Sequence, residues 1–140
     1  MINTTRFGIV VGGLVLAAMI TLSSCGANGP GTDSVQLSPA AAEGRSISNR
    51  NGCGACHGTS GEGGAGPAFA NLFGSTIELD DGSTVSVDRQ YVIESIKQPT
   101  AKRAEGFTVL MPPNGLTDAQ IDLIVAYIEA LAEVSAGSIP

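Results

Sequence analysis

Apolar residues recur at helical spacing near the C-terminus and alternate with polar residues in the middle of the chain. The C-terminal pattern follows a capping box at 117–120, Thr-Asp-Ala-Gln, and predicts the longest helix. Its apolar positions are Ile121, Ile124, Val125, Ile128, Leu131 and Ala132. The alternating stretch, 76–87, surrounds an Asp-Gly pair and predicts a small β-hairpin.

Two further helices are predicted from the residues at their ends. Residues 39–51 favour a short helix, because Ser38 can cap it and a proline stands in its first turn. Residues 89–97 favour another, which Asp88 caps and Pro99 ends. These elements together predict a mainly α domain.

The N-terminus has the pattern of an export signal. Residues 7–22 carry no charge, but this run is shorter than the roughly 20 apolar residues that a membrane span requires. The sequence Leu22-Ser23-Ser24-Cys25 that follows resembles the bacterial lipobox. The resemblance implies cleavage before Cys25 and a diacylglycerol group on its sulfur. The alternative is an uncleaved anchor with an incidental cysteine, and both alternatives place an exported domain at a membrane.

The chain is therefore expected to divide into three parts. Residues 1–24 are predicted to be a lipoprotein signal peptide. Residues 25–38 are rich in Gly, Pro and Ser without periodicity, which predicts a flexible linker behind the lipid anchor. Residues 39–135 are predicted to form the folded domain.

Charge and composition exclude some classes of partner. The chain has 13 acidic and 7 basic residues, a formal charge of -6 and a pI near 4.5. Nucleic-acid binding, which needs clustered Lys and Arg, is therefore excluded. Only 4% of the residues are aromatic and none is Trp, so the side chains alone offer few large groups for a core.

The motif with the clearest chemistry is Cys53-Gly-Ala-Cys56-His57, a c-type haem attachment signature. Two thiols three residues apart can reach the two vinyl groups of a porphyrin, and the next residue can offer an imidazole to the iron. One covalent haem c is therefore expected. A zinc site is excluded because His57 is the single histidine and Cys25 the single further cysteine. A thioredoxin-type dithiol needs a strand before the motif and a helix after it, but seven residues rich in glycine follow.

A second axial ligand can be predicted from the few metal-binding side chains that the sequence still offers. With no other histidine, a methionine thioether is the expected partner of low-spin iron. Met1 and Met19 lie in the predicted signal peptide, so Met111 remains. It stands before two prolines that keep this segment from becoming a helix.

At this point the chain resembles the class I mono-haem cytochromes c, over about residues 44–131. Within them it is most similar to the cytochrome c domain fused to some bacterial cytochrome c oxidase subunits II. The resemblance rests on GCGACHG, GPAF with LFGS, LDDGSTVSVDRQYVIESIKQP, GF with MPP, and LTDAQIDLIVAYIEAL. It implies a mainly α fold of three to four helices around one covalent haem, with a small β-hairpin.

The resemblance also implies individual roles. Cys53 and Cys56 would anchor the haem, with His57 and Met111 as iron ligands and the Pro67 carbonyl bonded to the imidazole. The residues implied to pack on the haem are Phe69, Leu72, Phe73 and Ile96. Gly44 and Tyr127 match the crossing of the first and last helices.

Charged residues near the expected haem are less clearly placed by the sequence. Lys97, Lys102 and Arg103 form a modest basic cluster near Met111. This cluster is interpreted either as a docking patch or as an ordinary solvated one. Tyr91 or Arg89 could bond a haem propionate.

The function expected from these features is that of an electron carrier rather than an enzyme. It would be exported and lipid-anchored on the periplasmic or outer face of a bacterial membrane. It would move single electrons in a respiratory or photosynthetic chain, between a quinol-oxidising complex and a terminal acceptor such as cytochrome c oxidase. Its partners would be redox proteins or membrane respiratory complexes, with no small-molecule substrate. No copper-binding domain precedes the haem module, so a stand-alone module is expected. The alternatives are a fixed subunit of alternative complex III or of an oxidase supercomplex, a peroxidase-like enzyme, and a dithiol oxidoreductase.

Overall fold

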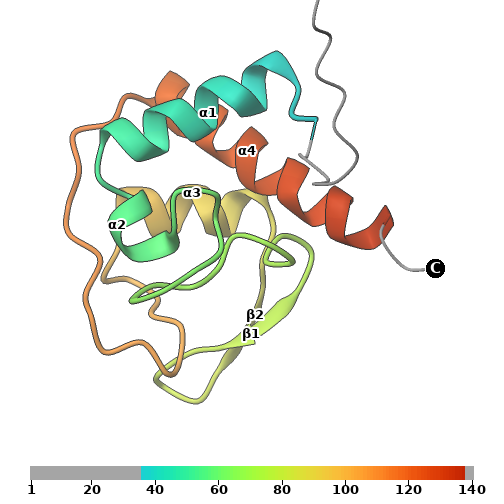
Figure 1. Ribbon diagram of the computed structural model, residues 1–140. Coiled ribbons are helices and arrows are strands. Elements are labelled where there is room, and N and C mark those ends of the chain that lie inside the picture. The colour runs from blue at the N-terminus through green and yellow to red at the C-terminus, as the bar shows by residue number, and fades with distance from the viewer. Residues whose placement is uncertain (1–35, 138–140) are drawn as a thin grey trace, which may run out of the picture. The chain divides into compact units, whose positions relative to one another are not determined.

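The computed structural model describes residues 36–137 (Figure 1). Four helices and one two-stranded sheet make up the regular structure of this range. Their bounds are α1 Pro39–Arg50, α2 Gly54–His57, β1 Thr76–Glu78, β2 Thr84–Ser86, α3 Arg89–Lys97 and α4 Asp118–Gly137. Three helices and the hairpin were predicted, whereas the single turn α2 was not.

The export and anchoring features cannot be followed in this structure. The predicted signal peptide 1–24, Cys25 and the predicted linker up to residue 35 lie outside the described residues. Residues 36–38 lead into α1 without regular structure. Within the described range, no helix combines the length and the apolar character needed to cross a bilayer.

The helix ends follow the local signals in the sequence. Ser38 Oγ accepts a hydrogen bond from the Ala41 amide at 3.2 Å, and Asp88 Oδ1 accepts one from the Tyr91 amide at 2.8 Å. At α4 the capping box is formed in both directions. The Thr117 amide donates to Gln120 Oε1 at 2.9 Å, and the Gln120 amide donates to Thr117 Oγ1 at 3.3 Å. Each cap satisfies amides that a helix start leaves without partners.

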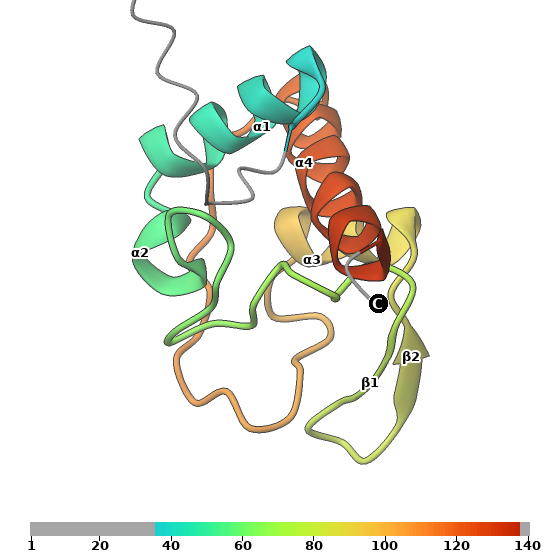
Figure 2. The ribbon, with the colours of Figure 1, turned by 45° about the vertical axis from the view of Figure 1, so that its right-hand side comes forward.

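Helix α4 packs against both α1 and α3, as Figure 2 shows. The crossing with α1 is very close at Gly44, where a methyl group would overlap the backbone carbonyl of Leu123. The three atoms nearest to that methyl position all belong to the α4 backbone. The glycine therefore allows the backbones of α1 and α4 to approach closely, at the crossing where the resemblance placed it.

The antiparallel hairpin pairs Thr76 with Ser86, Ile77 with Val85 and Glu78 with Thr84. The chain returns to this hairpin after α3, because Leu79 forms an isolated bridge with Ala104. The hairpin thus holds the start of the long irregular segment that joins α3 to α4.

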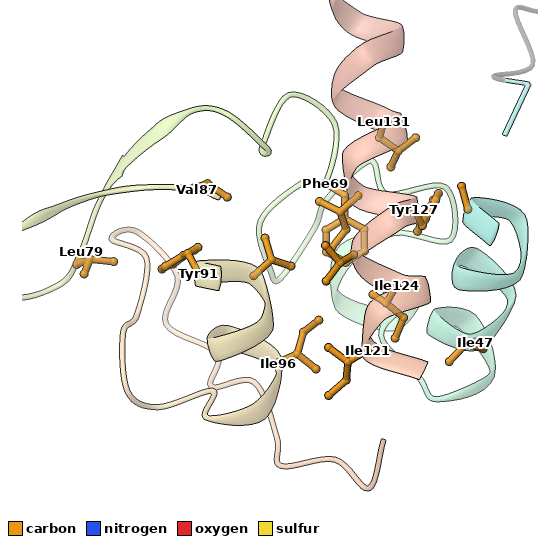
Figure 3. Packing of buried hydrophobic residues seen from close by; sticks show 14 residues of the cluster. Ile47, Phe69, Leu79, Val87, Tyr91, Ile96, Ile121, Ile124, Tyr127 and Leu131 are labelled. Carbon is orange, nitrogen blue, oxygen red and sulfur yellow. The ribbon is translucent and has the colours of Figure 1, made fainter. Parts of the chain in front are cut away.

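The core lies where α1, α3 and α4 meet the loop that follows α2 (Figure 3). Val125 and Val87 are completely buried, and Tyr127 is 2% exposed. The Phe69 ring meets Tyr127 edge-on, with centroids 6.1 Å apart. All six apolar positions predicted for the last helix are buried or half-buried. The buried hydrophobic residues are Ala41, Ile47, Phe69, Leu79, Val87, Tyr91, Val92, Ile96, Ile121, Ile124, Val125, Tyr127, Ile128 and Leu131.

Candidate cofactor-binding site

The Cys-X-X-Cys-His motif forms one tight turn. The Cys53 carbonyl accepts hydrogen bonds from the Cys56 amide at 3.1 Å and from the His57 amide at 2.9 Å. Cys53, at the N-cap of α2, and Cys56 therefore stand one turn apart, and residues at this spacing share a helix face. Both thiols are free and half-buried. Gly58, with a φ of +81°, ends the turn in a conformation that other residues rarely adopt.

The imidazole of His57 is held from three sides. Its Nδ1 atom lies 2.8 Å from the Pro67 carbonyl oxygen. Since a carbonyl can only accept, Nδ1 donates its proton to Pro67, and Nε2 is the nitrogen left to bind a metal. The ring stacks on Phe69 with centroids 4.6 Å apart. A methyl group on Gly66 would lie 2.9 Å from His57 Cε1, so the backbone itself touches the ring.

The glycine-rich segment after the motif folds back on it through backbone bonds. The Gly63 amide donates to the His57 carbonyl at 2.8 Å, and the Gly66 amide donates to the Cys56 carbonyl at 3.0 Å. Glu62 Oε2 accepts from the Ser60 amide at 2.8 Å. Hydrogen bonds from its own amide and from that of Ser60 hold the pKa of Glu62 below its usual range. This folded segment carries Pro67 to the imidazole.

Two adjoining cavities open beside His57. The larger has a volume of about 400 Å³ and the smaller about 280 Å³. Both are lined by His57, Pro67 and Met111. Together they form a largely apolar slot between α2, α3, α4 and the segment that joins the last two helices.

Most of the residues singled out from the sequence border this slot. Cys56 lines the smaller cavity. The larger is lined by Cys53, His57, Pro67, Phe69, Leu72, Ile96 and Met111. The exception is Phe73, which lines neither cavity and packs half-buried against the core.

The segment that carries Met111 has no regular structure but is anchored at its end. Asn114 Nδ2 donates to the carbonyl of Ile96 at 2.7 Å, which ties the segment to the last turns of α3. The preceding Val109 and Leu110 are 55% and 54% exposed. Met111 is half-buried and faces the same space as His57. One imidazole and one thioether are therefore presented to a single slot.

The slot fits an iron porphyrin by its chemistry as well as by its walls. Two free thiols stand beside it, and the imidazole and the thioether are a donor pair of the kind that low-spin haem iron takes. The walls are otherwise mainly aliphatic and aromatic, as a large flat apolar group requires.

Several lining residues were not identified as site residues from the sequence. They include Phe107 and Leu116 in the irregular segment, and Ile124 and Ile128 on α4. Helical spacing marked the two isoleucines as an apolar face, but it could not show that this face borders a slot. The path of an irregular segment leaves no periodic signal.

The three basic residues near Met111 are all engaged in ion pairs. Lys97 pairs with Asp118 at 2.7 Å, Lys102 with Glu94 at 2.7 Å and Arg103 with Asp80 at 3.2 Å. This internal pairing favours the interpretation of the cluster as solvated charges rather than as a basic docking patch.

The two residues suggested for a propionate lie in different places. Tyr91 lines the larger cavity. Arg89 lines neither cavity and joins α3 to α4 through Asp122 at 2.8 Å and Glu129 at 3.2 Å. The structure thus separates Arg89 from the slot.

Comparison with known families gives one match. The family model described as Cytochrome c matches residues 41–132, well over half of the chain. The matched range contains most of α1, all of α2, the hairpin and α3, and most of α4. A search of curated proteins finds no significant match.

Proposed function

Since this chain belongs to the cytochrome c family, which binds haem c covalently, we propose that it is a mono-haem electron carrier, lipid-anchored on the periplasmic or outer face of a bacterial membrane. The observation that carries the proposal is that His57 and Met111 line one apolar slot beside two free cysteines. The haem, when bound, supplies one-electron chemistry at its iron.

In this proposal Cys53 and Cys56 would hold the haem by thioether bonds, and His57 and Met111 would supply the iron ligands. The bond to the Pro67 carbonyl fixes the orientation and basicity of the imidazole. The aliphatic walls exclude water from the slot. A carrier needs both axial positions filled, because an open position would admit a small-molecule ligand.

Two enzymatic alternatives are less well supported. A peroxidase-like enzyme needs an open distal position, whereas Met111 faces the slot. A thioredoxin-like dithiol needs a parallel βαβ unit, whereas the sheet in the described range is the antiparallel β1–β2 pair.

The first test is haem staining of the denatured protein after co-expression with a haem-attachment system. Covalent haem survives denaturation, so the wild-type chain is expected to stain and a Cys53→Ser, Cys56→Ser double variant is not. A wild-type chain without stain would contradict the carrier and favour the dithiol. A stained ferric protein with a high-spin spectrum and rapid cyanide binding would favour the enzyme.

The finer features of the proposal come from the sequence. They are a stand-alone domain over 39–135 related to the domain fused to oxidase subunits II, a signal peptide 1–24, lipidation at Cys25 and a linker to residue 38. Two or three acyl chains anchor a protein stably where one does not. Labelled fatty acid is expected in the wild-type protein, and a Cys25→Ala variant is expected to lose both the label and membrane retention. Equal membrane retention of the wild-type protein and the Cys25→Ala variant would favour the uncleaved anchor.

The proposed partners are membrane respiratory complexes, with a quinol-oxidising complex as donor and a terminal oxidase as acceptor. The alternative is a fixed subunit of alternative complex III or of an oxidase supercomplex. Purification in mild detergent separates these models. A free carrier is expected to migrate alone, and co-migration with a multi-haem complex would support the fixed subunit.

A further inference from the structure

Two cationic residues line the larger cavity, Lys102 and Arg103. The other charged residues on its wall are Glu78 and Glu105, both exposed and without an ion-pair partner among the described residues. A haem brings two propionate carboxylates into its site. A cation stabilises these carboxylates on a wall that otherwise carries negative charge.

The backbone of Arg103 is fixed beside the slot by the hairpin. The Asp80 amide donates to the Arg103 carbonyl at 3.0 Å, and the Glu105 amide donates to the Glu78 carbonyl at 2.9 Å. The bridge between Leu79 and Ala104 lies between these two bonds. Three consecutive residues of the irregular segment are thus held as a short extension of the hairpin.

Only one nitrogen of the Arg103 guanidinium has a partner among the described residues. Its Nε atom lies 3.2 Å from Asp80 Oδ2, and its two terminal nitrogens have no partner among the described residues. Both side chains of the pair are a little over 40% exposed, so the pair itself contributes little to stability. A guanidinium presents donors on two edges, and one edge can therefore remain on Asp80 while the other binds a carboxylate.

The other cationic residues are less suited than Arg103 to bind a propionate. The Lys102 amine lies 2.7 Å from Glu94 Oε2, and this hydrogen bond raises the pKa of Lys102. The other cations of the described residues line neither cavity: Lys97, Arg89 and Arg50 are paired elsewhere, and Arg45 is exposed on α1.

We propose that Arg103 binds a haem propionate through its terminal nitrogens while Asp80 holds its Nε edge. The inference rests on the proposed haem site and gives a propionate-binding role to a residue that the sequence marked only as part of a basic cluster. Arg103 then offsets propionate charge near the iron. Because the ferrous haem has one positive charge fewer than the ferric haem, a nearby cation favours the reduced form and raises the reduction potential.

The test uses the haem-loaded protein in four forms: wild type, Arg103→Gln, Asp80→Asn and Arg50→Gln. Arg50 is the matched control, since it is an exposed, ion-paired arginine on α1 that lines neither cavity. Redox potentiometry is combined with redox-difference infrared spectra of protein carrying 13C-labelled propionates. Arg103→Gln is expected to lower the potential and to move a labelled carboxylate band. Asp80→Asn and Arg50→Gln are expected to leave that band in place and not to lower the potential.

If Arg103 serves only the ion pair with Asp80, Arg103→Gln and Asp80→Asn will lose the same stability and neither will move the labelled band. That result, or a crystal structure of the loaded protein with both propionates bound elsewhere, would overturn the assignment. Absence of covalent haem in the wild-type protein would instead contradict the proposed function, so the two failures are distinguishable.

Discussion

His57 Nδ1 and the carbonyl oxygen of Pro67 lie 2.8 Å apart across a loop of glycines. This bond and the contact of Gly66 with the ring fix the imidazole before any metal is bound. A histidine oriented in this way loses less freedom when it binds iron. The first prediction tests how strictly the ring position is enforced.

Gly66→Ala is expected to destabilise the protein by about 1–3 kcal/mol, the usual range for overpacking a well-packed site. The new methyl group would lie 2.9 Å from His57 Cε1, so the ring must move. Denaturant unfolding gives the stability, and the ferric absorption spectrum reports the altered ligation. Gly115→Ala is the matched control, because Gly115 also borders the smaller cavity but a methyl group there meets no atom within 4 Å. Equal effects of the two variants would contradict the ring-contact explanation.

Met111→Ala is expected to lower the reduction potential and to open the iron to external ligands. A thioether stabilises the ferrous state relative to the ferric one, so its removal favours oxidation. Potentiometry and cyanide binding to the ferric protein measure the two effects. Leu110→Ala is the control, since this neighbour also lines the slot and is 54% exposed. An unchanged potential in Met111→Ala would disprove the distal ligand.

Gly44→Ala is expected to be strongly destabilising, by several kcal/mol or by loss of folding. The added methyl group would overlap the Leu123 carbonyl, and neither backbone can move without separating α1 from α4. Thermal or denaturant unfolding measures the expected loss of stability in Gly44→Ala. The adjacent Glu43→Ala removes only one exposed ion pair with Arg50 and is expected to change stability by about 1 kcal/mol at most. A Gly44→Ala protein as stable as Glu43→Ala would show that the crossing is adaptable.

Tyr127→Phe is expected to leave the stability unchanged or to increase it. The hydroxyl is buried and makes no hydrogen bond within the described part of the chain, so its removal relieves a desolvation cost. Tyr127→Ala, in contrast, is expected to cost about 3–5 kcal/mol, because it leaves a cavity in the core. Denaturant unfolding of both variants separates the contribution of the ring to stability from that of its hydroxyl. A marked loss of stability in Tyr127→Phe would reveal a hydrogen-bond partner of the hydroxyl.

From the buried phenol of Tyr127 we expect the stability of the protein to depend on pH in the alkaline range. Burial raises the pKa of the Tyr127 phenol above its value in the unfolded chain. The folded state therefore keeps its proton where the unfolded state loses it, and folding becomes less favourable as pH rises above about 10. Below that pH the contribution of the protonated phenol to the stability of the fold is fully present. Unfolding measured between neutral and alkaline pH is expected to show a steeper fall in wild type than in Tyr127→Phe.

The sequence by itself determined the local elements and the main chemical groups. Caps at Ser38, Asp88 and Thr117 predicted where three helices begin, because a cap acts within one turn. The haem motif and the single remaining methionine could be identified because each depends on residue type and spacing alone. These features need no knowledge of the rest of the fold.

Only the tertiary structure decided which residues meet at the slot. It brought Phe107 and Arg103 to the cavity wall, and it placed Phe73 and Arg89 away from it. Phe107, Arg103 and Phe73 lie in segments between helices, and Arg89 begins α3. Whether such residues reach the slot is decided by contacts between residues far apart in the chain. The bridge of Leu79 to Ala104 and the bond of Asn114 to Ile96 are two such contacts. Local periodicity carries no information about them, because their energy comes from packing partners that the sequence does not make adjacent.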